Sequence, residues 1–319
     1  MKKIIIKCMP VIDIISLPFV LCGGVVLKFV RKAGLQRLPL TKKLLYRIGV
    51  FPIIDHYYEP LFNMKKLKYS LRADRSLPGI DINEDEQVRF LSKFHYADEL
   101  KTIPEKYESV TKFWYGNGSY SHGDAEYFYS LIRLIKPSKI IEIGSGSSTK
   151  IALMAVEKTK EEDPEYICDQ VCIEPYEQPW LEQLPVTVLR KKLEDVDYSL
   201  FEQLNTNDIL FIDSSHIIRP QGDVLKEYLE ILPRLKAGVY VHVHDVFTPK
   251  DYKDDWIYDE VKLWNEQYLL EAFLTGNKNF RIIGALNFLK HKHYDLMKEK
   301  FPLMTEAHEP GAFWMQKVI

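Results

Sequence analysis

The chain has few cysteines and no marked excess of charge of either sign. Its 319 residues include four cysteines, and 43 basic against 45 acidic side chains leave a net charge of -2. Four cysteines are too few for a disulfide scaffold, and the pair Cys168 and Cys172 lacks the second pair of a zinc site. The near-neutral balance gives no electrostatic basis for nucleic-acid binding. These absences indicate an ordinary folded protein with reduced cysteines, for which we expect a cytoplasmic location.

Residues 1–70 are apolar and basic, and we expect a helical extension there, followed by a linker and helical cap over residues 71–138. The uncharged run of residues 14–27 would make only ~21 Å of helix, short of the ~30 Å hydrocarbon core of a bilayer. Pro18 and the pair Gly23-Gly24 interrupt this run. The pattern therefore favours a helix pair or re-entrant segment over residues 10–30, at the inner face of a membrane. The pattern fits equally well a helix that packs on the rest of the chain or lies in a homodimer interface.

From Lys139 to the end of the chain, short apolar runs alternate with helical patterns. This alternation predicts an α/β fold for residues 139–319, with a doubly wound, mostly parallel sheet of seven strands and helices on both faces. The expected strands are residues 139–144, 170–175, 186–191, 208–214, 239–246, 280–287 and 312–318. Ligands of such sheets bind beyond the carboxyl ends of the strands, so the polar residues found there are the candidate site residues.

The first strand is followed by a turn of small residues, Gly144-Ser145-Gly146-Ser147-Ser148, in front of an apolar helix. Backbone N–H groups at such a helix start can bind an anionic or polar group of a ligand. The dinucleotide-binding fingerprint requires a third glycine where this chain has Thr149. The second strand ends in Glu174-Pro175, and the carboxylate of Glu174 can accept hydrogen bonds from both hydroxyls of a ribose. Together the two strand ends predict a site for an adenosine ligand.

The fourth and fifth strands end in ionisable residues. Asp213 follows four apolar residues, with His216 three positions further on, and the fifth strand ends in His244-Asp245. His242 shares one face of that strand with His244. We expect His216 or His244 to act as a general base, with Asp213 or Asp245 orienting it or binding a metal ion.

The stretch Glu142-x-Gly144-x-Gly146 resembles motif I of the class I S-adenosylmethionine-dependent methyltransferases. The later stretches "FIDSSH" and "VYVHVHDV" are similar to a subgroup that includes the macrocin-type sugar O-methyltransferases and the catechol-type enzymes. The resemblance covers roughly residues 116–319. It implies a Rossmann-like methyltransferase fold, S-adenosylmethionine as cofactor, and methylation of a hydroxyl on a small molecule, sugar or glycolipid.

The resemblance also implies roles for individual residues. Glu142 would hold the ammonium side of the methionine moiety, and Leu193 with Glu194 or Asp195 would border the adenine. The predicted cofactor-binding residues are Glu142, Gly144, Ser145, Gly146, Ser147, Ser148, Glu174, Pro175, Leu193, Glu194 and Asp213. Metal-dependent relatives place several carboxylates at these strand ends, whereas this chain has Asp213 and Asp245 with histidines between them. A magnesium ion at these aspartates and a metal-free mechanism therefore both stay open.

Two other functions are compatible with parts of the pattern. A nicotinamide-dependent oxidoreductase would use the same type of sheet, but the third glycine of its fingerprint is absent here. A non-catalytic binding protein could keep the methyltransferase fold, but we expect such a protein to lose its ionisable strand-end residues. Neither fits the sequence as well as a methyltransferase does.

Overall fold

A computed structural model describes residues 2–319 of the chain, with side chains from Cys8 onward. Met1 and the side chains of Lys2, Lys3 and Lys7, which belong to the predicted basic flank, lie outside the described part. The chain forms two compact units, Met1–Lys68 and Tyr69–Ile319.

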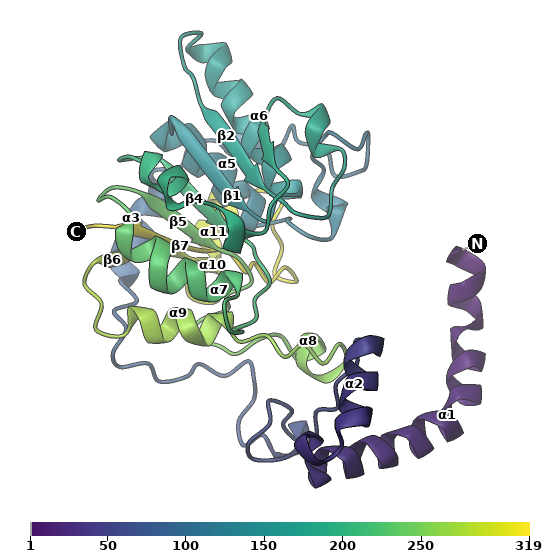
Figure 1. Cartoon of the computed structure of the whole chain (residues 1–319). Coiled ribbons are helices and arrows are strands. Elements are labelled where there is room, and N and C mark those ends of the chain that lie inside the picture. Colours follow the sequence, from purple (N-terminus) through teal and green to yellow (C-terminus); the bar gives the residue numbers. More distant parts are fainter. Residues whose placement is uncertain (1) are drawn as a thin grey trace. The chain divides into compact units, whose positions relative to one another are not determined.

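The first unit contains two α-helices, α1 (Lys2–Ala33) and α2 (Pro39–Ile48). The predicted helix pair over residues 10–30 is not found, because α1 is one continuous helix that includes Pro10 and Pro18. A proline removes one backbone hydrogen bond and bends a helix without having to end it. Figure 1 shows that α1 is indeed curved along its length.

A turn at Gly34 joins the two helices of this unit, with a positive φ of 89° at the glycine. Val30 of α1, Leu35 of the turn and Leu45 of α2 form a small buried cluster. The side chain of Arg31 lies 2.5 Å from a carboxylate oxygen of Glu59. These contacts fix the corner between α1 and α2, while most of the other α1 side chains from Cys8 onward are exposed.

The second unit is built on a seven-stranded sheet with the strand order β3-β2-β1-β4-β5-β7-β6. The strands are β1 (Lys139–Ile143), β2 (Asp169–Ile173), β3 (Thr187–Leu189), β4 (Ile209–Ile212), β5 (Tyr240–Val243), β6 (Phe280–Ala285) and β7 (Phe313–Lys317). β1 to β5 pair in parallel, and β7 pairs antiparallel with both β5 and β6. The predicted seven-stranded, mostly parallel sheet is confirmed.

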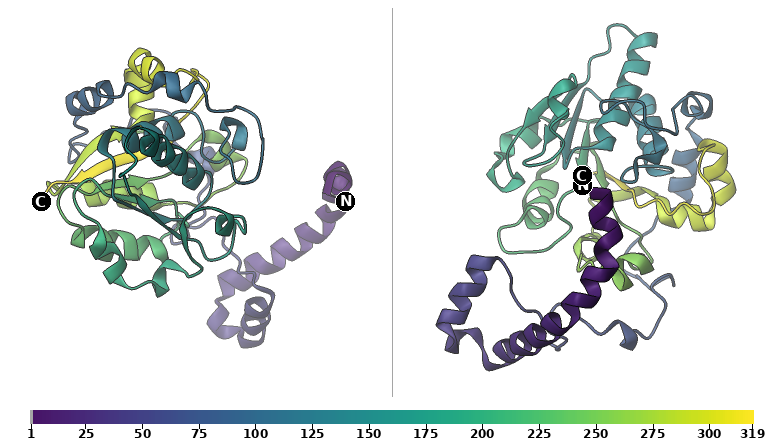
Figure 2. Two further views of the ribbon diagram at one scale, coloured as in Figure 1. Left: turned by 90° about the horizontal axis from the view of Figure 1, so that it is seen from above. Right: turned by 90° about the vertical axis from the view of Figure 1, so that its right-hand side faces the viewer.

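Helices cover both faces of the sheet (Figures 1 and 2). One group contains α3 (Glu84–Ser92), α5 (Asp124–Ile135), α6 (Ser147–Glu162), α10 (Leu286–Lys292) and α11 (Tyr294–Lys300). The other group contains α7 (Asp223–Lys226), the π-helical turn that follows it, and α9 (Glu266–Leu274). Two short helices, α4 (Ala97–Leu100) and α8 (Asp254–Tyr258), lie in the connecting segments.

The core of this unit lies between the sheet and its helices. Every residue of β4 and β5 is buried, which is expected for central parallel strands that are covered on both faces. α5 occupies residues 124–135, and its apolar face packs against α6. In this sheet the chain reverses its direction of winding between β1 and β4, where the order 3-2-1-4-5 has its topological switch point.

Candidate functional site

A cavity of about 710 Å³ opens at this switch point, beyond the carboxyl ends of the parallel strands. Its volume lies in the range of roughly 300–1,000 Å³ that is usual for small-molecule and cofactor sites. It is lined by Ser119 and Tyr120, by residues 143–148 and 173–178, by Lys192, Leu193 and Glu194, and by Asp213, Ser214, Ser215, Arg219, Pro220, Gln221 and Asp223. All the predicted cofactor-binding residues except Glu142 belong to this lining.

The small-residue turn after β1 forms the floor of the cavity. Gly144 has a φ of +77°, and a Cβ atom there would lie 1.8 Å from the carbonyl oxygen of Asp213. A Cβ atom on Gly146 would meet nothing within 4 Å, so this position faces the open space of the cavity. α6 begins directly afterwards at Ser147, so its first backbone N–H groups are available to an anionic ligand group such as a carboxylate.

Glu142 does not reach the cavity, and its predicted contact with the methionine moiety is corrected. The side chain is fully buried, accepts a 2.5 Å hydrogen bond from the hydroxyl of Thr149, and lies 3.5 Å from the sulfur of Cys172. Side chains alternate along a strand, so Glu142 points to the face of the sheet that α6 covers. Burial raises the pKa of Glu142 to about 7, against the hydrogen bond from Thr149, which lowers it.

Glu174 lies on the cavity wall, at the end of β2. One oxygen of its carboxylate accepts hydrogen bonds from the backbone N–H groups of Tyr176 (3.0 Å) and Glu177 (2.9 Å). These bonds fix the carboxylate in place and leave its second oxygen for a ligand hydroxyl. Leu193 and Glu194 lie on the wall in a short 3₁₀ turn after β3, whereas Asp195 of the same turn is not part of the wall.

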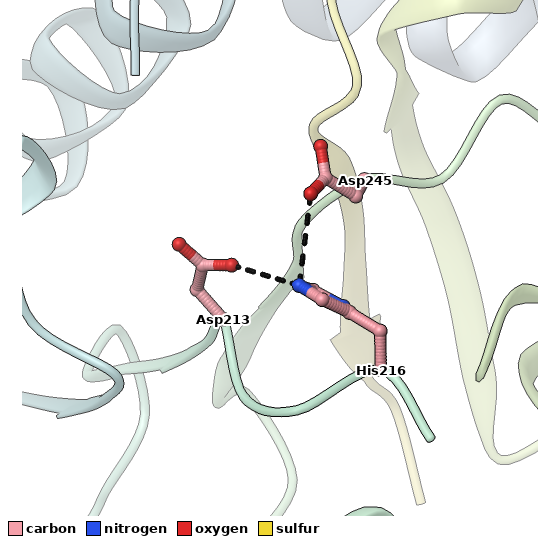
Figure 3. A group of neighbouring side chains, drawn as sticks. All are labelled: Asp213, His216 and Asp245. Carbon is pink, nitrogen blue, oxygen red and sulfur yellow. Dashed lines mark ion pairs between the residues drawn. The ribbon is translucent and has the colours of Figure 1, made fainter. Parts of the chain in front are cut away.

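Asp213, His216 and Asp245 form a compact triad beyond the ends of β4 and β5 (Figure 3). The Nε2 atom of His216 lies 3.3 Å from a carboxylate oxygen of Asp213 and 3.6 Å from one of Asp245. His216 and Asp245 both have a positive φ, 59° and 58°. Such backbone strain costs of order 1–3 kcal/mol at each non-glycine position and is concentrated at functional sites.

Glu266, at the start of α9, completes the surroundings of His216. Its carboxylate accepts a 2.8 Å hydrogen bond from Nδ1 of His216 and a 3.1 Å hydrogen bond from the hydroxyl of Tyr228. Burial lowers the pKa of His216, but the hydrogen bonds with Asp213 and Glu266 raise it, to about 10. No pattern in the sequence predicts this pair, because fifty residues separate Glu266 from His216 and no motif connects them.

His244 lies beside the triad and contacts it through Asp213. Its Nδ1 atom is 3.4 Å from Asp213, and its Nε2 atom is 3.6 Å from Asp124, the first residue of α5. Burial would lower the pKa of His244, but the charges of Asp245 and Asp213 raise it well above its usual value. Its neighbour His242 is fully buried, with its ring stacked 3.9 Å from that of Phe211. Burial lowers the pKa of His242, so this ring is neutral and belongs to the core.

The predicted catalytic residues are therefore brought together, and the neighbouring carboxylates raise the pKa of both His216 and His244. The triad offers two carboxylate oxygens and one imidazole nitrogen within 4.8 Å of one another. Carboxylate oxygens suit Mg²⁺ or Mn²⁺ and an imidazole suits Zn²⁺ or Fe²⁺, so this mixed donor set can hold a divalent cation. A histidine that binds a metal ion usually donates its other ring N–H to a carboxylate, and Glu266 has this position relative to His216.

Comparison with known proteins agrees with the geometry of the cavity. Residues 141–246 match the family model of a methyltransferase domain. The chain is 30% identical over 173 residues to an uncharacterized protein of Archaeoglobus fulgidus, covering 50% of this chain and 76% of that relative. The chain belongs to the class I S-adenosylmethionine-dependent methyltransferases, and it is an enzyme that uses S-adenosylmethionine.

Two solved structures are similar to this chain at low identity and low TM-score. One is the plantazolicin methyltransferase BpumL in complex with a triazolic desmethylPZN analog and SAH (15% identity, 75% of this chain and 98% of that chain, TM-score 0.35). The other is a TDP-rhamnose 3'-O-methyltransferase of calicheamicin biosynthesis (13% identity, 78% and 99%, TM-score 0.37).

Proposed function

We propose that this methyltransferase acts on a hydroxyl oxygen and that Asp213, His216 and Asp245 hold a divalent cation beside the cofactor. The observation that carries the proposal is the position of Asp213, which belongs both to the cavity wall and to the triad. A group bound at the triad is therefore next to a ligand in the cavity. The acceptor class that we infer is a hydroxyl compound such as a sugar, a glycolipid or another small molecule.

The residues of this chain contribute chiefly by positioning. S-adenosylmethionine supplies an activated methyl group and its own leaving group, and a divalent cation supplies polarisation of the acceptor oxygen. The turn at Gly144 and Gly146 and the carboxylate of Glu174 would hold the cofactor, so that its methyl group meets the acceptor in line at near-attack distance. An imidazole binds metal only in its neutral form, so a cation at the triad would compete with the proton on His216.

The aromatic side chains that follow β5 give no specific support for a sugar acceptor. Trp264 lies 4.3 Å from the ring of His216, measured between centroids, and 5.1 Å from the ring of Trp256. The ammonium group of Lys262 lies over both indoles, at 3.9 and 4.2 Å. Other side chains of this protein therefore pack on both indole rings, which indicates a packed cap. The inferred acceptor class rests on the triad and not on these aromatic side chains.

Calorimetry of two matched variants tests this arrangement. Asp213→Asn is expected to weaken both S-adenosylhomocysteine and Mn²⁺ binding, because Asp213 belongs to both sites. Asp245→Asn is expected to weaken Mn²⁺ binding alone, because Asp245 does not line the cavity. Unchanged Mn²⁺ affinity in both variants would contradict the metal site.

A transfer assay tests the acceptor. Full-length protein with methyl-labelled S-adenosylmethionine is incubated separately with lipid-extracted glycans and with soluble metabolites. We expect label in an alkali-stable methyl ether. Label that appears only in amines or thioethers would contradict oxygen as the acceptor atom.

A further inference from the structure

The helix α1 is apolar on all sides. Its segment Cys8–Ala33 is long and apolar enough to cross a membrane, and within it only Val30, near the α2 end, is buried. Large exposed side chains occur at positions that point in every direction around the axis, among them Leu17, Phe19 (76% exposed) and Val20. A helix that binds only to a membrane surface needs a polar face, and this segment does not have one.

The length of α1 matches the thickness of a bilayer. The 20 residues from Cys8 to Leu27 extend ~30 Å in a helix, which is the thickness of the hydrocarbon core. They contain a single charged residue, Asp13, which lies within two turns of the Cys8 end and so near the membrane surface. The re-entrant arrangement expected from the sequence needs a break in the helix that the structure does not show.

Basic residues are distributed unequally about this segment. Three of them, Lys2, Lys3 and Lys7, lie in the seven residues before Cys8, and seven lie in the twenty residues 28–47. The side of a membrane helix that is richer in lysine and arginine stays in the cytoplasm. The chain after Ala33 is thereby assigned to the cytoplasmic side, where S-adenosylmethionine is made.

The segment after α1 has the composition of a membrane interface. Exposed apolar and aromatic side chains follow one another here: Leu40 (83% exposed), Leu44, Tyr46, Ile48, Phe51, Tyr57 and Tyr58. Lysines and arginines lie among them, at positions 42, 43 and 47. Aromatic rings and basic side chains are enriched at the headgroup level, and α2 is held next to the end of α1 by the buried cluster around Leu35.

We propose that α1 crosses a lipid bilayer once, that α2 and the following loop lie in its cytoplasmic interface, and that the catalytic unit is thereby anchored to the membrane. The occupant of the exposed surface of α1 is the hydrocarbon of the bilayer. This inference is independent of the acceptor and of the metal site.

Extraction of membranes from cells that make the full-length protein gives the first test. We expect the protein to stay in the pellet after high salt and after alkaline carbonate. The double variant Leu17→Lys, Leu21→Lys places two charges in the middle of the span and is expected to move most of the protein to the carbonate supernatant. The matched control Leu40→Lys, Leu44→Lys makes the same changes in α2 and is expected to stay in the pellet.

Cysteine labelling of intact cells with a membrane-impermeant maleimide tests the orientation. In a Cys8→Ser background, we expect Lys3→Cys to be labelled from outside and Ser70→Cys to be labelled only after the membrane is opened. Equal labelling of the two would mean that α1 dips into one leaflet and would overturn the single span. Release of the wild type by carbonate, a homodimer that is soluble without detergent, or a mature protein that lacks α1 would each overturn the proposal as well.

Discussion

The two glycines of the turn after β1 are expected to fail in different ways when they are replaced. Gly146→Val adds a side chain in open space, where it meets no atom of the protein within 4 Å of its Cβ position. We therefore expect a normally folded protein whose cofactor site is filled. Gly144→Ala adds a single methyl group 1.8 Å from the carbonyl oxygen of Asp213, far inside any ordinary contact. It is expected to damage the fold itself.

The structure also sets the size of each effect. Overpacking costs about 1–3 kcal/mol and a positive φ about 1 kcal/mol more for alanine, so Gly144→Ala should lose roughly 2–4 kcal/mol of unfolding free energy. At about 2–4 °C per kcal/mol, this lowers Tm by roughly 4–16 °C. For the wild type, S-adenosylhomocysteine at one hundred times its Kd should contribute about 2.7 kcal/mol, and in Gly146→Val this gain should disappear.

Thermal unfolding with and without S-adenosylhomocysteine measures both effects on the same samples. The expected pattern is a wild-type Tm without ligand and no ligand shift for Gly146→Val, against a lowered Tm without ligand for Gly144→Ala. A normal ligand shift in Gly146→Val would refute the assignment of the cavity as the cofactor site. An unchanged Tm in Gly144→Ala would refute the close approach of β1 and β4.

Three further predictions concern carboxylates. Glu174→Ala should weaken S-adenosylhomocysteine binding by roughly 1.5–3 kcal/mol in calorimetry, through the lost hydrogen bonds to ribose hydroxyls; equal affinity would contradict that contact. Glu266→Gln should weaken Mn²⁺ binding about 10–100-fold, whereas the exposed control Glu260→Gln should bind Mn²⁺ like the wild type. An equal loss of Mn²⁺ affinity in both variants would contradict the proposed role of Glu266 in orienting His216. The folded-state pKa of Glu142 is raised to about 7, so its contribution to stability is fully present below its unfolded pKa of about 4.5 and is lost as pH rises through 7. Glu142→Gln should therefore remove up to about 3 kcal/mol of the fall in unfolding free energy between pH 4.5 and pH 8, and an unchanged pH profile from denaturant titration would contradict the buried carboxylate.

The sheet was predictable because its signals are local. Each strand is a short apolar run, and the rule that ligands bind at the carboxyl ends of parallel strands identifies the site without any knowledge of side-chain contacts. Gly144 and Glu174 were found in this way. Glu142 was not placed correctly, since the resemblance assigned it to the ligand although strand alternation turns its side chain toward α6.

The rest of the site depends on contacts between distant parts of the chain. Glu266 supports His216 from fifty residues away, and Asp124 reaches His244 from the start of α5. No spacing within one segment predicts either pair, because the tertiary fold alone brings them together. The continuity of α1 was missed for another reason: Pro18 removes one hydrogen bond, which a long apolar helix tolerates by bending.

The turn at Gly144 connects the cofactor cavity to the proposed metal site. Its backbone N–H donates to the carbonyl of Ile173 in β2, and its missing side chain lets the carbonyl of Asp213 approach from β4. The side chain of Asp213 then contacts His216 on one side and His244 on the other. A shift of this turn would therefore displace the cavity floor and the triad together. Because methyl transfer requires donor and acceptor to be aligned within a fraction of an ångström, a single rigid turn that sets both positions is a physical reason for glycine at residue 144.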